Sequence, residues 1–403
     1  MKRMRLGFDL RPFLKLETGV GVYFRNLLFE LARLDAENEY YLFSASWKDR
    51  FPPEKVPPFK HSRFRDLRWP VKAVNIGWYR FGRPSLDSIF GVRLDLTHSP
   101  TPLPLPTRGR KIVTVCDLFF MDYPGKADAE ARRHFLKRTE VSLRRADGVV
   151  TISEFTKLAL LDRFELDEAK IKVTPLGLSR SFQASPAPPP SVPTAPRTSA
   201  VPAEVGDPAG DPVGATLRKY GLPGEFLLFV GATEARKNLP RLIEALAIVH
   251  RKFRPVPLVL VGRQGGDHAR LMAEIRARGL EAWVRLPGYL PEAEVGAFYR
   301  AASGFVFPST CEGFGLPLLE AMAGGLPAAV SGVSALPEVG GDAALYFRPE
   351  DPEDIAAKII RLLSDEDLRT TLRARGRERA RAFTWEKTAS ETLAFYRTVL
   401  GRS

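Results

Sequence analysis

One short segment constrains the fold of this chain more than any other. The apolar run Gly304–Phe307 is followed by a loop with two glycines and then by the helix-forming letters L-L-E-A-M-A. A continuous apolar run of this length indicates a buried strand. Pro317 stands in the first turn of the helix, where its missing N–H costs little. The sequence therefore predicts a strand, a glycine loop and a helix in direct succession.

Two carboxylates flank the glycine loop, eight residues apart. We expect Glu312 on the loop and Glu320 about one turn into the helix. The N–H groups of Phe314, Gly315 and Leu316 should point outward at the positive end of the helix dipole, which favours an anion. Such a site suits a ligand with phosphates at one point and hydroxyls on either side, as in a nucleotide-sugar. Taken alone, the letters also fit a surface loop with a solvated glutamate and a helix-start glutamate.

Two cations precede another predicted helix in the second half of the chain. The apolar run 226–230 leads to Gly231, and Arg236 and Lys237 come just before a helix expected from Pro240 onward. Arginine offers a fork of donors to phosphate oxygens, and lysine offers a compact positive charge. An exposed basic turn is the alternative interpretation.

Other apolar runs predict further strands, and apolar residues at helical spacing predict helices. Ser153 is expected to cap a helix that begins at Glu154. The helices are otherwise expected at 23–34, 355–363, 368–383 and from 385 onward. The additional strands are expected at 5–10, 40–44, 94–98, 111–115, 149–153, 171–173, 257–261, 284–286, 336–339 and 344–347.

These motifs resemble those of one enzyme family. The letters E-G-F-G-L-P-L-L-E-A-M-A-G-G-L-P resemble the E-x7-E signature of the family 4 retaining glycosyltransferases. The pattern G-x4-R-K-N at 231–238 is similar to a companion motif that grips the donor diphosphate in that family. The similarity covers most of the chain apart from a Pro/Ala-rich stretch near its middle. The resemblance implies an α/β structure of the GT-B type, with two Rossmann-like domains that face each other across a cleft.

The resemblance also implies where the domains begin and end. Residues 1–180 would form an N-terminal, acceptor-side domain, and residues 218–382 a C-terminal domain that binds the nucleotide-sugar. Residues 181–217 are rich in proline and alanine and cannot build a core, so they predict a linker or insertion. Residues 383–403 would form a helix that crosses back and packs on the first domain.

The donor site implied by the resemblance lies mainly on the second domain. Arg236 and Lys237 would bind the diphosphate, Glu312 the hydroxyls of the donor sugar, and Glu320 the ribose hydroxyls. A Gly-Val-Gly turn after the first strand would lie against the diphosphate, although Phe24 stands where a dinucleotide fingerprint needs its third glycine. The expected donor-binding residues are Gly19, Gly21, Gly231, Arg236, Lys237, Gly262, Tyr289, Leu290, Glu312, Gly313, Phe314, Gly315, Leu316 and Glu320.

The acceptor side is expected at two strand ends of the first domain. His98 opens a proline-rich loop on the crevice side of a parallel sheet, with a structural role as the alternative. The letters V-T-V-C-D-L place Cys116 where relatives carry histidine in V-x-x-H-D-L, and a thiol cannot donate to a sugar hydroxyl with the same geometry. Asp117 is therefore the expected acceptor contact or base. The expected catalytic residues are Asp117, Arg236, Lys237 and Glu312.

Charge and composition suggest partners. The net charge is +13, and about +10 of it lies before residue 179. This imbalance suggests an anionic partner, and because no nucleic-acid-binding motif accompanies it we expect no nucleic acid and a peripheral membrane contact through the first domain. A generally basic proteome is the alternative explanation. Two cysteines and the lack of a spanning or signal segment predict a cytoplasmic protein, some of it at the inner face of the membrane.

The predicted function is metal-independent, retaining transfer of a hexose, with mannose favoured, from a nucleotide-sugar to a saccharide or lipid-linked acceptor. We expect no metal site and no cofactor beyond the nucleotide-sugar co-substrate. A sugar-nucleotide epimerase on the same scaffold and a non-catalytic nucleotide-sugar-binding protein are the alternatives. A nicotinamide oxidoreductase lacks support, because the glycine fingerprint and its ribose-binding acid are missing.

Overall fold

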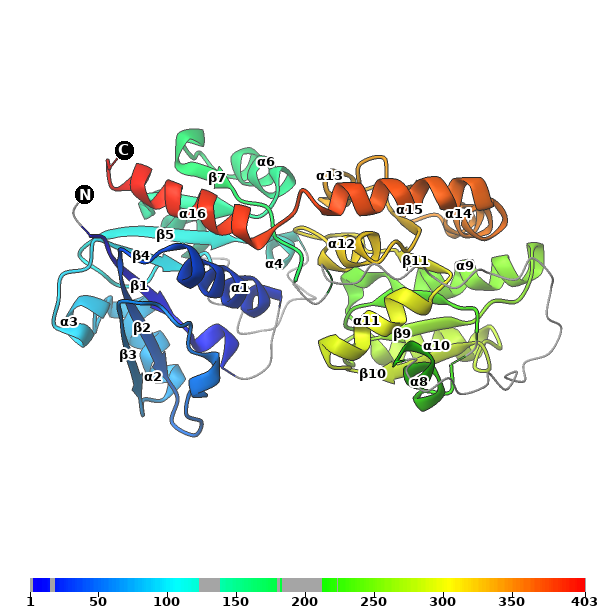
Figure 1. Ribbon diagram of the computed structural model, residues 1–403, viewed down its shortest axis with the longest axis horizontal. Coiled ribbons are helices and arrows are strands. Elements are labelled where there is room, and N and C mark those ends of the chain that lie inside the picture. Colours follow the sequence, from blue (N-terminus) through cyan, green and yellow to red (C-terminus); the bar gives the residue numbers. More distant parts are fainter. Residues whose placement is uncertain are drawn as a thin grey trace. The chain divides into compact units, whose positions relative to one another are not determined.

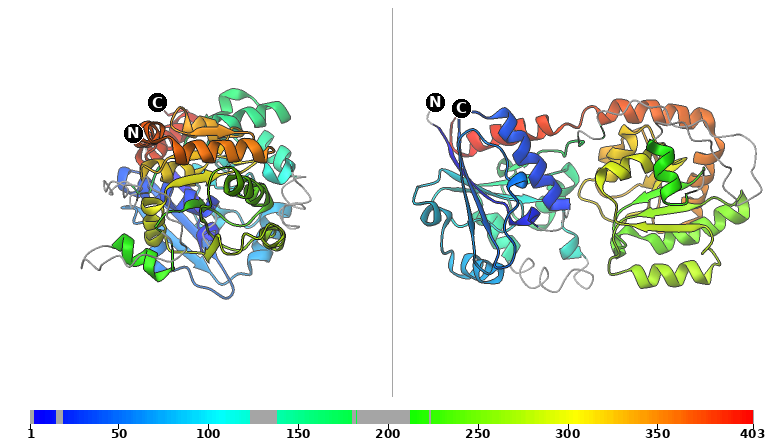
Figure 2. Two further views of the ribbon diagram at one scale, coloured as in Figure 1. Left: turned by 90° about the vertical axis from the view of Figure 1, so that its right-hand side faces the viewer. Right: turned by 60° about the horizontal axis from the view of Figure 1, so that its bottom comes forward.

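The chain folds into two compact units, each built on one parallel sheet. A computed structural model describes residues 3–14, 19–122, 138–179, 182, 212–222 and 224–402. The first unit is Met1–Gly177 together with Phe383–Ser403, and the second is Leu178–Ala382. Helices cover both faces of each sheet (Figures 1 and 2). The predicted α/β class with two Rossmann-like domains is confirmed.

The sheet of the first unit reverses its strand order between β1 and β4. The order is β3-β2-β1-β4-β5-β6-β7, so β2 and β3 lie on one side of β1 and all later strands on the other. Phe8 of β1 pairs in parallel register with Leu42 on one side and His98 on the other. A reversal of this kind opens a crevice at the carboxyl ends of the strands. The strands are β1 (Arg5–Asp9), β2 (Glu39–Ala45), β3 (Ser62–Leu67), β4 (Leu96–Ser99), β5 (Arg110–Val115), β6 (Gly148–Thr151) and β7 (Ile171–Val173).

Apolar side chains from the strands and the covering helices make the core of the first unit. Phe43 and Trp78 belong to one buried cluster, and Val113 and Leu160 to another. Ser153 caps α6 as predicted, because its Oγ accepts from the N–H of Thr156 at 3.1 Å. The helical segments are η1 (Arg11–Phe13), α1 (Gly19–Leu34), η2 (Pro53–Lys55), α2 (Val71–Ile76), η3 (Gly77–Phe81), α3 (Leu86–Phe90), α4 (Phe119–Asp122), α6 (Glu154–Arg163), η4 (Glu168–Lys170) and α16 (Trp385–Val399).

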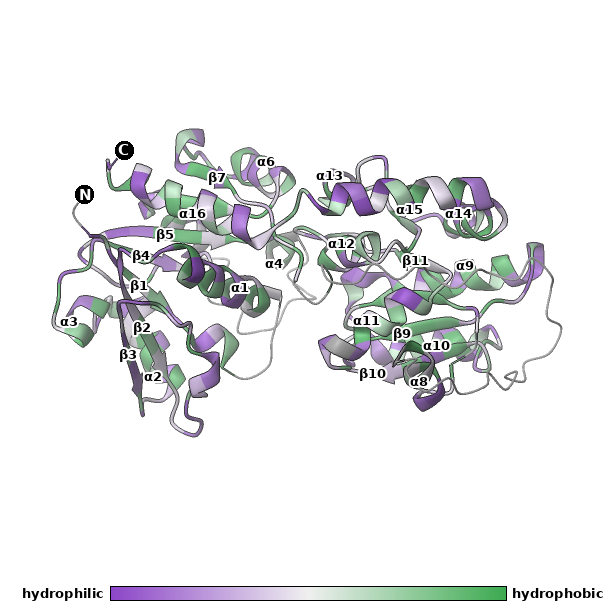
Figure 3. Cartoon of the chain, in the orientation of Figure 1, coloured by the Kyte–Doolittle hydropathy of each residue, from purple (hydrophilic) through white to green (hydrophobic). Residues whose placement is uncertain are grey.

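The C-terminal helix α16 belongs to the first unit and lies beside α1 (Figure 1). Hydrophobic and hydrophilic bands alternate along α16 in Figure 3, as in an amphipathic helix with one buried face. Gly177 permits the close approach of this helix, because a Cβ at that position would lie 2.0 Å from the backbone nitrogen of Trp385. The return of the chain end to the first unit therefore depends on a residue without a side chain.

A buried hydrogen-bond chain joins α16 to the sheet. Oη of Tyr396 lies 2.6 Å from Nδ1 of His98, and Nε2 of His98 lies 2.7 Å from Oγ1 of Thr114. Oγ1 of Thr114 lies 3.2 Å from Oη of Tyr23 in α1. The chain of polar groups thus connects α16, β4, β5 and α1 within an apolar core.

The prediction that His98 contacts the acceptor is wrong. Its side chain is fully buried, and both ring nitrogens already have partners. The rings of Phe8 and Phe24 lie 6.5 and 5.6 Å from it, measured between centroids. Burial lowers the pKa of His98 to about 3, so the ring is neutral at physiological pH. The residue does lie near the carboxyl end of a strand, but the strand directs it into the core beneath α16.

The sheet of the second unit reverses its order between β8 and β11. The order is β10-β9-β8-β11-β12-β13, and the described pairings are parallel. Phe305 of β11 pairs with Leu228 of β8 on one side and Ala328 of β12 on the other. The strands are β8 (Leu227–Val230), β9 (Leu258–Val261), β10 (Val284–Gly288), β11 (Gly304–Phe307), β12 (Ala328–Ser331) and β13 (Leu345–Phe347).

The helices of the second unit correct two sequence predictions. The segment 336–339, predicted as a strand, lies in helix α13, and the last residues of the predicted linker lie in α8, which packs on α11. Residues 181 and 183–211 of that linker lie outside the described residues. The helical segments are α8 (Pro212–Lys219), η5 (Ala235–Lys237), α9 (Leu239–Lys252), α10 (His268–Ala277), α11 (Glu292–Ala301), α12 (Leu316–Ala323), α13 (Leu336–Gly340), α14 (Pro352–Ser364) and α15 (Glu366–Ala380).

The structural role of His98 predicts the effect of Tyr396→Phe. Loss of the hydroxyl leaves Nδ1 of a buried histidine without its partner, which costs about 1–3 kcal/mol. We expect that loss in the free energy of unfolding measured in urea. The same change at Tyr289, whose ring is 70% exposed, should alter stability by less than about 0.5 kcal/mol. Unchanged stability of the Tyr396 variant would contradict this role for the network.

Candidate active site

Two loops meet where the strand order of the second unit reverses. The short helix η5 follows β8 and carries Arg236 and Lys237, and the loop between β11 and α12 carries Glu312. Because β8 and β11 are parallel neighbours, both loops emerge from the same edge of the sheet. Ligands of open α/β sheets bind at this kind of reversal, outside the carboxyl ends of the strands.

Three charged side chains from these loops are in direct contact. Nζ of Lys237 donates to Oε1 of Glu312, and Nη1 of Arg236 donates to Oε2 of the same carboxylate at 2.9 Å. Nε of Arg236 also donates to Glu234 at 3.1 Å. The structure thus brings the predicted cationic turn and the predicted acidic loop together. Both oxygens of Glu312 contact cations, whereas the sequence led us to expect them on sugar hydroxyls.

Because the cluster is buried, its charged side chains depend on one another for partners. Lys237 and Glu312 are only 6% and 7% exposed. Burial by itself would raise the pKa of Glu312, but the charges of Lys237 and Arg236 outweigh it and lower that pKa to about 2. Burial lowers the pKa of Lys237, and Glu312 opposes this. We assign an ion pair at neutral pH, because a neutral Lys237 would deprive the buried carboxylate of a partner.

Backbone features hold the cationic turn in place. Asn238 ends η5 with a φ of 55°, a left-handed conformation that asparagine adopts more readily than most residues. Its Nδ2 donates to the carbonyl of Pro349 at 2.8 Å. The carbonyl of Arg236 accepts from the N–H of Thr310 at 2.8 Å, so the two loops are joined by backbone as well as by side chains.

Gly231 and Gly262 stand where two loop backbones touch. They follow β8 and β9, and a Cβ on Gly262 would lie 2.1 Å from the carbonyl oxygen of Gly231. Only glycine fits this approach without a backbone shift. The structure therefore gives these residues a packing role beside η5, and their contact with a donor stays a prediction.

The acidic loop is held from the side of α13. The N–H of Glu312 donates to Oγ of Ser334 at 3.1 Å, and Ser334 itself has a φ of 57°. Gly315 precedes α12 with a φ of 106°, and a Cβ there would lie 2.6 Å from Cδ2 of Leu336. Because α12 begins at Leu316, its first N–H groups have no acceptor within the helix, which favours an anion at this end. Gly313 and Phe314 are buried in the same loop.

Glu320 lies in α12 and has a partner that the sequence did not reveal. Its Oε2 accepts from Oη of Tyr299 in α11 at 2.8 Å. Burial raises the pKa of Glu320 to about 7, against the opposing effect of that hydrogen bond. The pKa of Glu312 is therefore lowered and that of Glu320 raised, so the two carboxylates lose their charge in different pH ranges.

Of Tyr289 and Leu290, both expected to bind the donor, only one side chain is exposed. Tyr289 follows β10 and is 70% exposed, whereas Leu290 is 6% exposed and packs in the core. A ring that projects from the sheet edge can stack on a flat ligand. Leu290 is buried, so it can contribute to such stacking only by supporting the loop that carries Tyr289.

The predicted residues of the first unit lie on separate elements. Asp117 follows β5, is partly buried, and its Oδ1 accepts from the N–H of Phe119 at 3.1 Å. Burial raises the pKa of Cys116, so this thiol stays protonated at neutral pH. Gly19 and Gly21 lie inside the first turn of α1, although the sequence predicted a turn before a helix starting at residue 23.

The structure contains an ion pair, at the reversal of the first sheet, that the sequence analysis did not predict. Nη2 of Arg11 donates to Oδ2 of Asp9, the last residue of β1, at 2.7 Å, and the guanidinium lies 4.5 Å from the ring centroid of Trp78. A cavity of about 520 Å³ adjoins it, lined among others by Trp47 and Lys72. The letters F-D-L-R at the end of the first predicted strand are the one signal that could have indicated this pair.

Comparison with known proteins decides the family. Residues 218–379 match the glycosyl transferases group 1, and residues 18–182 match glycosyltransferase family 4. The chain is 30% identical over 406 residues to the O-antigen chain mannosyltransferase B of Escherichia coli, covering 98% of this chain and 100% of the relative. The chain belongs to glycosyltransferase family 4.

Solved structures show the same fold for this glycosyltransferase. A sucrose-phosphate synthase from Thermosynechococcus elongatus matches with a TM-score of 0.74 and 20% identity, covering 100% of both chains. HepE from Anabaena, in complex with UDP and glucose, matches with a TM-score of 0.70 and 16% identity, covering 97% of this chain and 100% of that one. These likenesses establish the GT-B fold.

The described residues of this glycosyltransferase contain neither a grouped set of metal-binding side chains nor a membrane-spanning helix. No three histidine, cysteine, aspartate or glutamate side chains among them are grouped so as to hold a metal ion. No helix within the same residues is both long enough and apolar enough to cross a bilayer.

The pKa of Glu320 predicts a pH effect on nucleotide binding. A ribose hydroxyl donates to the ionised carboxylate, so affinity should fall as the pH drops through about 7. Calorimetric titration of GDP and UDP into the wild type and Glu320→Gln separates this effect from ionisation of the ligand. For each nucleotide, the affinity of the wild type divided by that of Glu320→Gln should be roughly tenfold larger at pH 8 than at pH 6. A ratio that does not change with pH would remove Glu320 from the binding site.

Proposed function

We propose that this glycosyltransferase transfers a hexose with retention of configuration from a nucleotide-sugar that lies on the second unit. The observation that carries the proposal is the buried cluster of Arg236, Lys237 and Glu312 at the reversal between β8 and β11. The cluster places two cations beside the start of α12, where a diphosphate would find both positive charge and backbone donors.

Catalysis would concentrate on the leaving group. Cleavage of the bond between sugar and diphosphate leaves negative charge on the departing phosphate. Donors that are already in place stabilise such charge without having to reorganise during the reaction. Arg236 and Lys237 meet this condition, because Glu312 fixes both of them before a ligand arrives. The same charges would make a metal ion unnecessary.

Glu312 would serve two partners at once. Each carboxylate oxygen has more than one lone-pair site, so an oxygen that accepts from a cation can also accept from a sugar hydroxyl. Its low pKa keeps it ionised throughout the physiological range. Glu320, about one turn into α12, would bind the ribose hydroxyls while Tyr299 orients its carboxylate.

The acceptor would bind at the carboxyl edge of the first sheet. Asp117 lies at this edge after β5, and the Asp9–Arg11 pair lies at the reversal of the sheet. Trp47, 67% exposed beside the adjoining cavity, offers a flat ring to a sugar. We propose Asp117 as the group that contacts or deprotonates the acceptor hydroxyl.

Mannose is the proposed donor sugar, and a saccharide or lipid-linked chain the proposed acceptor. The support is the relative named an O-antigen chain mannosyltransferase, which matches this chain over its full length. Exposed apolar side chains of the first unit, Ile76 at 55% and Phe81 at 67%, lie close in sequence to Lys72 and Arg80. This combination supports peripheral membrane contact. Equal sedimentation with neutral and anionic vesicles would contradict an electrostatic contribution.

Removal of either cation should abolish most of the transfer. We expect Arg236→Ala and Lys237→Ala each to lower kcat/KM by two or more orders of magnitude, as for loss of a charge-stabilising donor. Lys252→Ala, at an exposed lysine paired with Glu353 on the same unit, is the matched control and should stay near wild type. Circular dichroism would confirm that each variant is folded. Near-wild-type rates in both site variants would sink the proposed mechanism.

The donor can be identified by ligand-induced stabilisation. A ligand that binds the folded state raises the unfolding temperature, and at a fixed concentration the rise is larger for a ligand that binds more tightly. Among nucleotide-sugars we expect GDP-mannose to give the largest rise, and NMR of the product should show the anomeric configuration of the donor. An inverted product would refute retention. Altered sugar-nucleotide in the absence of any acceptor would instead indicate an epimerase.

A further inference from the structure

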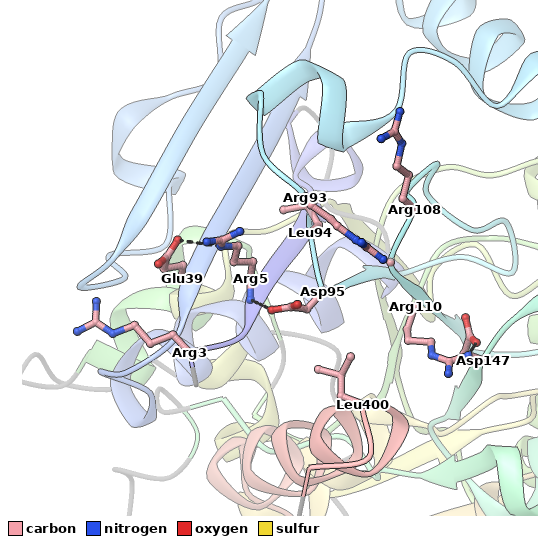
Figure 4. A pocket seen from close by; sticks show the side chains of 11 residues that line it. Arg3, Arg5, Glu39, Arg93, Leu94, Asp95, Arg108, Arg110, Asp147 and Leu400 are labelled. Carbon is pink, nitrogen blue, oxygen red and sulfur yellow. Dashed lines mark hydrogen bonds and ion pairs between the residues drawn. The ribbon is translucent and has the colours of Figure 1, made fainter. Parts of the chain in front are cut away.

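The first unit contains a second charged cavity, at the opposite end of its sheet from the acceptor edge. The cavity measures about 630 Å³, and Figure 4 shows the side chains around it. Five arginines and three carboxylates line it. Most of these residues stand at or just before the start of a strand: Arg5 begins β1, Glu39 begins β2, and Arg110 begins β5. We call this cavity the arginine groove.

The carboxylates of the arginine groove are already engaged by partners. Glu39 accepts from Oη of Tyr41 at 2.7 Å and lies 3.8 Å from Nε of Arg5. Asp147 accepts from Nη1 of Arg110 at 2.6 Å and from the backbone N–H of Lys111 at 2.8 Å.

Asp95 completes this arrangement. Its Oδ2 accepts from the N–H of Arg5 at 2.9 Å, and its Oδ1 lies 3.5 Å from Nη2 of Arg402. Arg5, Arg110 and, from outside the groove, Arg402 thus pair with the three carboxylates, and within the described part of the chain no acidic side chain is left for the other arginines that line the groove.

Three arginines of the groove have no carboxylate partner among the described residues. Arg3, Arg93 and Arg108 are exposed, and no described acidic side chain lies within ion-pairing distance of their guanidinium groups. They come from three different segments, before β1, β4 and β5 respectively. Like charges that line one cavity without counter-charge repel one another, so an anion bound in the cavity would be stabilised.

Backbone packing brings two of these arginines together. A Cβ on Gly109 would lie 2.4 Å from the carbonyl oxygen of Leu94, and the N–H of Arg110 donates to the carbonyl of Asp95 at 2.9 Å. The segment that carries Arg93 is therefore pressed against the segment that carries Arg108 (Figure 4). The positive charge of the groove is built into adjacent strand starts and does not depend on a long flexible loop.

The groove is separate from the acceptor edge. Between them lies the length of the strands, four residues in β4 and six in β5. At about 3.3 Å per residue, this is roughly 13–20 Å. One ligand group cannot occupy both ends of the sheet.

We propose that the arginine groove is a binding site for a phosphate-bearing anion. Guanidinium groups match phosphate oxygens with two parallel hydrogen bonds, which makes arginine the preferred residue for this ligand. The volume of the groove is in the range of small-molecule sites. No aromatic side chain lines it within the described part of the chain, so a nucleobase would find no ring on which to stack. The phosphate can belong to a soluble ligand or to a lipid headgroup.

The test uses inorganic pyrophosphate as the probe and the full-length protein. Arg93→Ser/Arg108→Ser removes the two arginines that the backbone presses together. Arg145→Ser/Arg251→Ser, at two exposed arginines outside the groove, removes the same charge and is the matched control. Calorimetric titration at low salt is carried out on wild type, both double variants and Lys237→Ala, whose donor site is altered.

We expect Lys237→Ala, in which the arginine groove is intact, to keep one class of pyrophosphate sites. At that class of sites the groove variant should bind at least tenfold more weakly than Lys237→Ala, and the control variant should bind like wild type. Lys237→Ala alters the donor site and leaves the arginine groove intact. A failure of the proposed transfer mechanism would therefore not decide whether the groove binds pyrophosphate. Pyrophosphate binding in the groove variant within twofold of wild type at every site would overturn the proposal.

Sedimentation with phosphatidylglycerol vesicles identifies the source of the phosphate. Loss of sedimentation in the groove variant but not in the control supports a lipid headgroup. Equal sedimentation of both variants, together with weaker pyrophosphate binding in the groove variant, supports a soluble phosphate ligand.

Discussion

A single buried carboxylate holds the candidate site together. Glu312 receives Lys237 and Arg236 on its two oxygens, and the turn and loop that carry these residues are also joined through the backbone between Thr310 and Arg236. A buried charge without a partner costs about 3–5 kcal/mol, so each member of the cluster restrains the others. The reversal of strand order between β8 and β11 makes the cluster possible, because it brings segments 75 residues apart to one edge.

The two units use the same topological device with different chemistry. At the reversal of the second sheet, two cations contact the carboxylate of Glu312, and such an arrangement suits a diphosphate. In the first unit it carries the Asp9–Arg11 pair beside a cavity with an exposed tryptophan, which suits a saccharide. The arginine groove lies at the amino edge of that same sheet, where no reversal opens a crevice. Its charge comes from arginines near strand starts that have no acidic partner among the described residues.

Most buried strands could be predicted from the sequence because their apolar runs are continuous, but the buried strand β12 was missed. The runs at Gly304–Phe307 and 226–230 became the central pair β11 and β8. β3 escaped prediction because it is an exposed edge strand, S-R-F-R-D-L, without an apolar run. The letters L-P-E-V at 336–339 look like a short strand, yet Pro337 lies in the first turn of α13, a position that proline favours.

The candidate site was predictable in part. The motifs located the cationic turn and the acidic loop, but spacing along the chain cannot reveal that Glu312 contacts the cations directly or that Tyr299 holds Glu320. His98 shows the same limit, because its burial depends on a helix about 300 residues later in the chain. Tertiary contacts of this kind leave no local pattern.

A crystal structure with a nucleoside diphosphate bound would show whether the two joined loops of the second unit hold the phosphates. We expect phosphate oxygens within about 3 Å of Nζ of Lys237 and of the guanidinium of Arg236, with Glu312 still bound to both cations. A diphosphate bound elsewhere, with this ion cluster unchanged and remote from it, would show that the cluster does not bind the donor.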